Sequence, residues 1–376
     1  MRIPFNKPYL TGKETDYIRD AVATGKISGD GLFTMKCHKF FEERYGFNKA
    51  LLTTSCTDAL EMAAILCGIE PGDEVIAPSY TFVSTVNAFV LRGARIIFAD
   101  SEESTPNVDV SKIEELITKR TKAIIPVHYA GIACDMDAIL SLASKYDLFV
   151  VEDAAQAIDS FFMGKPLGSF GHFAAFSFHE TKNIISGEGG MLVVNDPRFE
   201  KRAEIIREKG TNRSAFFRGE VDKYGWVDIG SSFLPSEIIA AFLYAQLENI
   251  DHIQKRRSRL WDLYWEALFP LAQKGYLQLP LIPYYATNNA HIFYIVCENV
   301  QQRTELIRHT WENGILTVFH YQSLHMSEYY RGRHDGRELV NSDKYSDCLI
   351  RLPLFYELKE EDVLFIARCI ARFFTN

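Results

Sequence analysis

The sequence lacks any long apolar run. No stretch of about 18 uncharged apolar residues, the length that a membrane-spanning helix requires, occurs in its 376 residues. Residues 1–8 do not contain the apolar segment of a signal peptide. We therefore expect a globular protein that stays in the cytoplasm and binds no membrane.

Cysteine motifs are also missing. The seven cysteines show no CxxC spacing, and their number is odd. Both facts argue against a disulfide framework and against a zinc site. The sequence predicts reduced thiols and no bound metal.

The chain has no excess of basic residues. It carries 41 Lys and Arg against 49 Asp and Glu, a net charge of -8. Nucleic-acid binding through phosphate neutralisation needs a basic face, so this balance argues against it. An anionic substrate would need local arginines, because the overall field repels it.

Apolar residues, by contrast, are plentiful and regularly spaced. A hydrophobic content of 47% is enough for one large core and a smaller second one. Short apolar runs alternate with amphipathic stretches between residues 49 and 195, which indicates crossover connections and a mostly parallel sheet covered on both faces. The predicted strands are 50–52, 74–77, 95–99, 123–127, 149–151, 174–178 and 191–194, and the predicted helices are 58–67, 84–91, 111–118 and 136–145.

This alternation stops after residue 195. Two long helical segments, 236–249 and 253–268, lead out of the first region. The remainder predicts a smaller α/β lobe with strands at 292–296 and 316–320 and helices at 304–313 and 360–374. We expect a large domain over 1–250 and a small C-terminal domain over 251–376.

Asp153 and Lys182 carry the strongest chemical signal. Asp153 ends an apolar, β-branched strand, so its carboxylate is delivered to the carboxyl edge of the sheet, where ligands bind. Lys182 lies shortly after the next predicted strand, 174–178. Pyridoxal phosphate needs an amine for a Schiff base and an acid to keep its ring nitrogen protonated, and these residues supply one of each. Taken singly, a surface lysine and a helix-capping aspartate are the alternatives.

Hydroxyl groups near this pair suit a phosphate. The segment 53–57, Thr-Thr-Ser-Cys-Thr, lies between a strand and a helix, where N–H groups and the helix dipole attract anions. Thr57 is alternatively the N-cap of that helix. Ser177 adds a hydroxyl five residues before Lys182, and Gly187-Glu-Gly-Gly190 predicts a tight turn beside the lysine.

Together these motifs resemble the DegT-type sugar-nucleotide aminotransferases, pyridoxal-phosphate enzymes of the aspartate-aminotransferase fold (fold type I). The similarity covers essentially the whole chain and includes segments 29–31, 78–84, 126–131, 152–156, 177–182, 320–321 and 324–325. Within the family the chain is most similar to dTDP-4-amino-4,6-dideoxygalactose transaminases, on segments 54–57, 178–183 and 207–214.

The resemblance implies a role for each matching position around the cofactor ring. Lys182 would form the Schiff base and carry the proton, and Asp153 would pair with the pyridine nitrogen. Gln156 would face the phenolic oxygen of the cofactor. Phe82 would stack on the ring, although an aromatic residue in this setting also suits a core.

The resemblance also implies a phosphate site. Thr57, the backbone of Asp58, and Ser177 would hold the cofactor phosphate. Many relatives add an Asn from the neighbouring subunit. Ser232 stands at that place here, and its shorter side chain weakens the expectation of that contact.

The segment 210–230 is long for a structureless loop and carries Arg213 and Arg218 with several aromatics. One interpretation is a solvated hairpin with its aromatics packed beneath it. The other, which the resemblance favours, is a segment that crosses a homodimer interface and offers its arginines to the diphosphate of a nucleotide-sugar. His320 and Tyr321 end a strand and would face the sugar, or else form a hydrogen-bonded corner.

The resemblance predicts transfer of an amino group from glutamate to C4 of dTDP-4-keto-6-deoxyglucose, giving dTDP-4-amino-4,6-dideoxygalactose and 2-oxoglutarate for a surface polysaccharide. A 3-amino or 4-epimeric transferase of the same family is the alternative. A sugar dehydratase would have histidine in place of Lys182. A non-catalytic regulator would need a DNA-binding head and a basic face.

Overall fold

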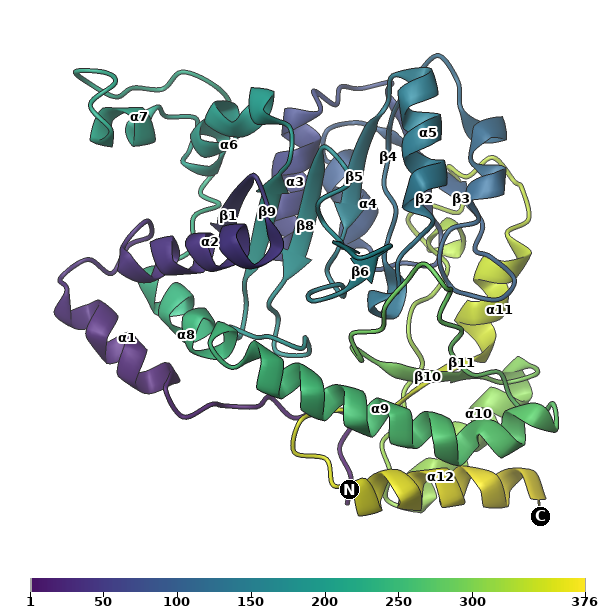
Figure 1. The fold of residues 1–376 in the computed structure, drawn as a ribbon. Coiled ribbons are helices and arrows are strands. Elements are labelled where there is room, and N and C mark those ends of the chain that lie inside the picture. Colours follow the sequence, from purple (N-terminus) through teal and green to yellow (C-terminus); the bar gives the residue numbers. More distant parts are fainter. Residues whose placement is uncertain (1, 376) are drawn as a thin grey trace.

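The large domain is built on a seven-stranded sheet. The computed structural model describes residues 2–375, and its strands are ordered β1-β9-β8-β5-β4-β2-β3 (Figure 1). The bounds are β1 Lys49–Thr53, β2 Glu74–Pro78, β3 Arg95–Ala99, β4 Thr121–Ile124, β5 Phe149–Asp153, β8 Phe173–Ser177 and β9 Gly190–Val194. Every strand predicted in this region is therefore present, with small shifts at the ends.

The sheet is mostly parallel. Strands β3, β2, β4, β5 and β8 pair in parallel, whereas β9 runs antiparallel to both β8 and β1. This arrangement confirms the predicted mostly parallel sheet. The carboxyl ends of the parallel strands consequently meet at one edge.

Helices cover both faces, because successive strand residues point in opposite directions. Leu51 packs into one core and its neighbour Leu52 into the other. One face packs against α3 (Cys56–Leu66), α4 (Ser84–Val90) and α6 (Glu200–Arg207), and the other against α2 (Leu32–Tyr45), α5 (Met136–Tyr146) and α8 (Glu237–Leu247).

The C-terminal part forms a smaller lobe with its own core. Helix α9 (Ile250–Gln273) leads into it and lies along α12 (Glu360–Thr375) in Figure 1. The lobe also contains the antiparallel pair β10 (Phe293–Val296) and β11 (Leu349–Leu352), with α10 (Val300–Glu312) and α11 (Val340–Cys348). Ile3 packs into the same core, so both chain ends meet there. The division at residue 250 stays a prediction.

The remaining elements are short or lie outside the sheet. They are α1 (Glu14–Ala23), α7 (Arg213–Phe217), and the two-stranded pair β6 (Phe161–Phe162) and β7 (Lys165–Pro166). Within residues 2–375, no helix has both the length and the apolar character that crossing a membrane requires.

Two predicted elements are wrong. The segment 111–118 forms two 3-10 turns, because its buried residues Ile113 and Leu116 are three apart, the spacing that a 3-10 turn aligns. The segment 316–320 is no strand: only Val318 pairs, with Arg351, and the residues after it turn toward a cavity.

Gly190 positions the N-terminus of α3. A Cβ atom here would lie 2.3 Å from the carbonyl carbon of Ser55 and 2.4 Å from the nitrogen of Cys56. The absence of a side chain therefore lets β9 approach the first turn of α3. The chain bends at Gly187, whose φ is 79°, where the sequence predicts a tight turn.

We expect Gly190→Ala to lower the free energy of unfolding by about 1–3 kcal/mol, because the clashing atoms belong to the backbone and cannot rotate away. Urea denaturation measures this change. Gly332→Ala is the matched control, since nothing lies within 4 Å of the added Cβ. Equal stability of the two variants would contradict the close-approach argument.

Candidate active site

A cavity of about 760 Å3 opens between the carboxyl edge of the sheet and the small lobe. The large domain contributes the start of α3, the end of β5 and the segment after β8. The small lobe contributes residues 318–321 and the end of β11. Most residues predicted for the cofactor and the sugar line it, namely Lys182, Asp153, Thr57, Phe82, Gln156, Ser177, His320 and Tyr321.

Lys182 supplies the amine of this cavity. Its backbone N–H donates to the carbonyl of His179 at 2.9 Å, which folds the segment after β8 back on itself. Burial lowers the pKa of Lys182, and the positive charge of Arg351 adds to this effect, whereas Cys56 and Asp153 oppose it. The neutral, nucleophilic amine is therefore populated at lower pH than in an ordinary lysine.

Asp153, the last residue of β5, supplies a buried carboxylate. Its Oδ2 accepts a hydrogen bond from the Thr85 hydroxyl at 2.6 Å, and its Oδ1 accepts one from the Ala155 N–H at 3.1 Å. Each oxygen has room for a second donor. The carboxylate is thus fixed in place and still able to accept a hydrogen bond from a ligand.

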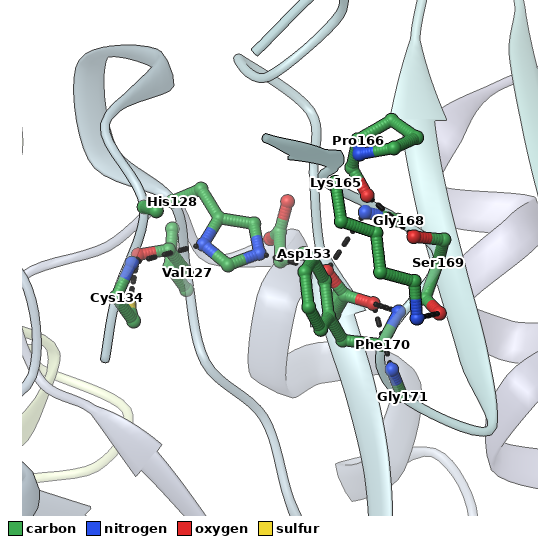
Figure 2. Close-up of polar contacts among 12 residues, drawn as sticks. Val127, His128, Cys134, Asp153, Lys165, Pro166, Gly168, Ser169, Phe170 and Gly171 are labelled. Carbon is green, nitrogen blue, oxygen red and sulfur yellow. Dashed lines mark hydrogen bonds and ion pairs between the residues drawn. The ribbon is translucent and has the colours of Figure 1, made fainter. Parts of the chain in front are cut away.

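The neighbouring Glu152 anchors the end of β5 from the opposite face. Its carboxylate accepts hydrogen bonds from the N–H groups of Gly168, Phe170 and Gly171, each at 2.8 Å. Figure 2 labels these three donor residues together with His128. His128 Nε2 lies 3.0 Å from the same carboxylate. Burial opposes the charge, yet the bonds from His128 and these backbone groups hold the pKa of Glu152 below its usual value.

The tautomer of His128 follows from its other contact. The Cys134 N–H donates to His128 Nδ1 at 3.2 Å, so the ring proton resides on Nε2 and faces Glu152. The backbone N–H of His128 also donates to the carbonyl of Asp153 at 3.2 Å. His128 therefore contacts the end of β5 twice, through its ring at Glu152 and through its backbone N–H at Asp153.

The first turn of α3 presents hydroxyl groups to the cavity. Ser55, and not Thr57, is the N-cap, since its hydroxyl accepts from the Asp58 N–H at 3.1 Å. Thr57 instead donates to Ser84 at 2.8 Å. The Asp58 N–H already donates to Ser55, so a bound phosphate would have to replace that acceptor. The side chain of Asp58 accepts a hydrogen bond from the Thr54 hydroxyl. The phosphate roles of Thr57, Asp58 and Ser177 stay predictions.

Aromatic and polar side chains, those of Phe82, Gln156 and Tyr321, form another part of the cavity wall. The ring of Phe82 is 55% exposed and lies 6.0 Å from that of Tyr321. Gln156 accepts from the Ala130 N–H at 2.7 Å and donates to the Tyr321 hydroxyl at 2.9 Å. Gln156 is thereby held at the cavity by one neighbour from each lobe.

His320 and Tyr321 stack on each other, with ring centroids 3.6 Å apart. His320 Nδ1 lies 2.6 Å from the Tyr129 hydroxyl. Burial, with nearby positive charge from Arg351 and Lys182, holds the pKa of His320 well below its usual value, so its ring is neutral. Burial raises the pKa of Tyr321. These residues offer hydrogen bonds without adding charge.

The predicted residues Arg213, Arg218 and Ser232 do not lie in this cavity. Arg213 pairs with Glu208 at 2.6 Å, and Arg218 pairs with Glu204 at 2.8 Å. Both arginines line a separate cavity of about 600 Å3. Ser232 is exposed and bridges to Glu208.

The segment 210–230 is not structureless, because it contains α7, which stands out from the body at the upper left of Figure 1. Thr211 bridges to Trp226, as in a hairpin. The aromatics do not all pack beneath it, however: Trp226 is 84% exposed and Phe217 is 69% exposed. Phe216 does pack against Phe217 and Tyr224, with ring centroids 5.6 Å apart in each pair, so both interpretations stay open.

Sequence reasoning missed several residues of the cavity, including His291 and Arg351. His291 is buried, with Nδ1 2.9 Å from the Asn183 side-chain oxygen. Arg351 lies in β11, among apolar residues. A charged residue inside an apolar strand was the available signal for Arg351, whereas His291 has no distinctive sequence context.

The pH dependence of Lys182 is testable in cofactor-free protein. We expect trinitrobenzenesulfonate to modify Lys182 with an apparent pKa below that of exposed lysines, measured by mass spectrometry of the Lys182 peptide. Asp153→Asn should lower this value further by removing a negative charge, and Arg351→Gln should raise it by removing a positive one. Shifts of the opposite sign would contradict the electrostatic description.

The cavity fits pyridoxal phosphate. It combines an amine of lowered pKa, a fixed carboxylate with spare acceptor capacity, an exposed aromatic face at Phe82, and hydroxyls at a helix N-terminus. These are the groups that bind, respectively, an aldehyde carbon, a pyridinium nitrogen, a flat ring and a phosphate.

Comparisons with known proteins agree with this fit. The family model described as the DegT/DnrJ/EryC1/StrS aminotransferase family matches residues 8–371. GDP-perosamine synthase of Escherichia coli O157:H7 is 33% identical, over 100% of this chain and 99% of its own. Spore coat polysaccharide biosynthesis protein SpsC of Bacillus subtilis is 32% identical, over 96% and 94%. The PLP form of the putative sugar aminotransferase Spr1654 from Streptococcus pneumoniae superposes with a TM-score of 0.90 at 25% identity, over 99% and 98%.

Proposed function

Since the chain belongs to the DegT/DnrJ/EryC1/StrS aminotransferase family, we propose that it transfers the amino group of glutamate to C4 of dTDP-4-keto-6-deoxyglucose. It is a sugar aminotransferase of fold type I, and its cofactor is pyridoxal phosphate. The observation that carries the proposed chemistry is the cavity in which Lys182, with its lowered pKa, shares a wall with the fixed carboxylate of Asp153.

The choice of sugar rests on the sequence. Segments 54–57, 178–183 and 207–214 resemble those of dTDP-4-amino-4,6-dideoxygalactose transaminases almost residue for residue. The names of the relatives support a role in making polysaccharide sugars, since one acts in spore coat polysaccharide biosynthesis and another is named a perosamine synthase. We assign the product to a surface polysaccharide on the same grounds.

The residues of the chain define the chemistry that each would perform. The bound cofactor supplies a carbonyl carbon for the amino group and an electron sink in its protonated ring. Asp153 would accept a hydrogen bond from the ring nitrogen and hold its proton, with Thr85 and Ala155 fixing the carboxylate. Thr57 and Ser177 would donate to the phosphate, and Phe82 would cover one face of the ring.

Lys182 would act twice. Its neutral amine would hold the bound cofactor through the carbonyl carbon. Once the amino group of the donor had displaced it, Nζ would take the proton from the α-carbon of the donor and later give it up again. The lowered pKa suits this cycle, because the amine must be neutral before it accepts the proton. Residues of the small lobe, including Val318, Leu352 and Leu354, line the cavity and would limit the entry of water.

Purified enzyme supplied with glutamate and dTDP-4-keto-6-deoxyglucose should yield dTDP-4-amino-4,6-dideoxygalactose and 2-oxoglutarate. NMR of the product identifies both the aminated carbon and its configuration, which separates this sugar from the 3-amino and 4-epimeric alternatives. Lys182→Ala, the control, should yield none.

Other outcomes would replace the proposal. Release of ammonia without an amino sugar would indicate a dehydratase, and absence of turnover with any keto sugar would indicate a regulator. Faster turnover of the UDP-linked or GDP-linked keto sugar would reassign the nucleotide.

We further propose that the enzyme is a homodimer whose segment 210–230 serves the active site of the partner. Support comes from the exposed aromatics of this segment and from its two arginines, which suit a diphosphate. The same segment lies outside the cavity of its own chain. A second copy would cover the aromatic side chains and receive the arginines.

Mixing two inactive variants tests this proposal. One parent carries Lys182→Ala, and the other carries Arg213→Ala with Arg218→Ala. Heterodimers formed from them should regain one working site of two, measured as recovered turnover after subunit exchange. Arg259→Ala, which removes an exposed arginine paired with Glu360 in the small lobe, is the control and should remain active by itself. No recovery would place the segment outside the partner's site.

A further inference from the structure

His291 lies just before β10 and lines the cavity that contains Lys182 and Asp153. Its ring is buried, and its Nδ1 is 2.9 Å from the side-chain oxygen of Asn183. The side-chain nitrogen of Asn183 donates to the backbone carbonyl of Asn289 at 2.8 Å. Because a carbonyl only accepts, this contact fixes the orientation of the Asn183 amide, and the amide oxygen faces His291. The ring therefore carries a proton on Nδ1.

The other ring nitrogen, Nε2 of His291, receives no hydrogen bond from any group among residues 2–375. It is not enclosed in the core either, so it opens on the cavity that the residue lines. Burial holds the pKa of His291 well below its usual value, and the positive charge of Lys182 adds to this effect. The ring is thus neutral, and the lone pair on Nε2 is free to accept a hydrogen bond in the cavity.

The backbone of His291 is held from both lobes. Its N–H donates to the side-chain oxygen of Asn289 at 3.0 Å, and its carbonyl accepts from Nη2 of Arg257, in α9, at 2.6 Å. The side-chain nitrogen of Asn289 donates in turn to the carbonyls of Gln156 and Ile158, both at 2.8 Å. These two carbonyls belong to the segment that follows β5. The ring of His291 is consequently fixed relative to the large-domain side of the cavity.

Lys182 offers the donor that matches this acceptor. It directly precedes Asn183, so the side chain that orients His291 is adjacent in the chain to the one that supplies the amine. The backbone N–H of Lys182 donates to His179, but within the described residues nothing accepts a hydrogen bond from its Nζ. An amine nitrogen carries two N–H groups and an ammonium three. Lys182 and His291 therefore present an unused donor and an unused acceptor to one cavity.

A neutral acceptor suits an amine that must gain and then lose a proton. A carboxylate beside Nζ of Lys182 would favour the ammonium and raise its pKa. The lone pair of a neutral imidazole accepts an N–H from either form and adds no charge. A contact with His291 would therefore fix the position of Nζ and leave the pKa of Lys182 lowered.

We propose that His291 positions Lys182: its Nε2 accepts a hydrogen bond from Nζ once the amino donor has displaced the lysine, and Asn183 fixes the tautomer that this contact requires. The inference rests on the proposed function, since it takes Lys182 to carry the proton. His291 touches neither substrate in this arrangement. It directs the lone pair of Nζ toward the carbon that exchanges the proton, in both half-reactions.

Two substitutions test the acceptor in the holoenzyme. His291→Leu removes Nε2, whereas His291→Gln places a side-chain oxygen close to the same position. We expect His291→Leu to slow the single-turnover half-reactions of glutamate and of the sugar nucleotide alike, by about 10- to 100-fold, as for loss of a hydrogen bond to a charged group. His291→Gln should recover most of this loss. His309→Leu is the matched control, because His309 also makes one ring contact, to the carbonyl of Cys369, but outside the cavity.

Two further measurements do not depend on turnover. In a Lys182→Ala background, His291→Leu should leave the dissociation constant of 2-oxoglutarate unchanged within about twofold by calorimetry, because the two sites are independent once the amine is gone. Nitrogen-15 NMR of the histidine rings reports the contact itself. In enzyme loaded with pyridoxamine phosphate, Lys182 is free, and the Nε2 resonance of His291 should lie upfield of its position in Lys182→Ala. The resonance is assigned by its loss in His291→Gln.

Several outcomes would overturn the inference. A loss confined to one half-reaction, or weaker 2-oxoglutarate binding, would assign His291 to a substrate. Equal losses in His291→Leu and His291→Gln would show that the acceptor does not matter. An Nε2 resonance that ignores Lys182→Ala, or that carries the ring proton, would exclude the contact.

Failure of this inference is distinguishable from failure of the proposed function. If wild-type enzyme does not react with glutamate, the proposed function is wrong, and the NMR comparison still tests the contact between His291 and Lys182. If wild type reacts and His291→Leu, folded by circular dichroism, reacts equally fast, this inference alone fails. Should His291→Leu not fold, the NMR comparison in otherwise unaltered enzyme decides.

Discussion

The geometry of the site depends on the hydrogen bonds that the buried carboxylate of Glu152 accepts. Three backbone N–H groups and His128 converge on it, so the end of β5 cannot shift without breaking several charge-assisted hydrogen bonds. Because adjacent strand residues point to opposite faces, fixing Glu152 also fixes the direction of Asp153. The parallel register of β5 with β8, in which Asp153 pairs with Ala175, then sets where the segment carrying Lys182 begins.

The cavity is electrostatically balanced around Lys182. The carboxylate of Asp153 favours the charged amine, whereas burial and the guanidinium of Arg351 disfavour it, and the net effect is a lowered pKa. The nearby His320 and Tyr321 are held neutral. A site of this kind can change the charge of one amine during a reaction without titrating its neighbours at the same pH.

The two lobes contribute different parts of the chemistry. The large domain supplies the amine, the acid and the helix N-terminus, all held by the sheet and by the close approach at Gly190. The small lobe supplies Arg351 and the stacked pair of His320 and Tyr321. The residues proposed for the cofactor therefore lie mainly on the large domain, and those proposed for the sugar belong to the small lobe.

The sequence by itself determined the mostly parallel sheet and the acid at a strand end that is followed by a lysine, because the alternation of apolar runs with amphipathic stretches is a local pattern. It could not show that Ser55 rather than Thr57 caps α3, since both are good caps and only the path of the chain decides. The charge of Arg351 inside an apolar segment was a signal, but only the tertiary structure shows that this segment borders the cavity. The strand predicted at 316–320 failed for the same reason, because pairing depends on a partner that only the folded lobe provides.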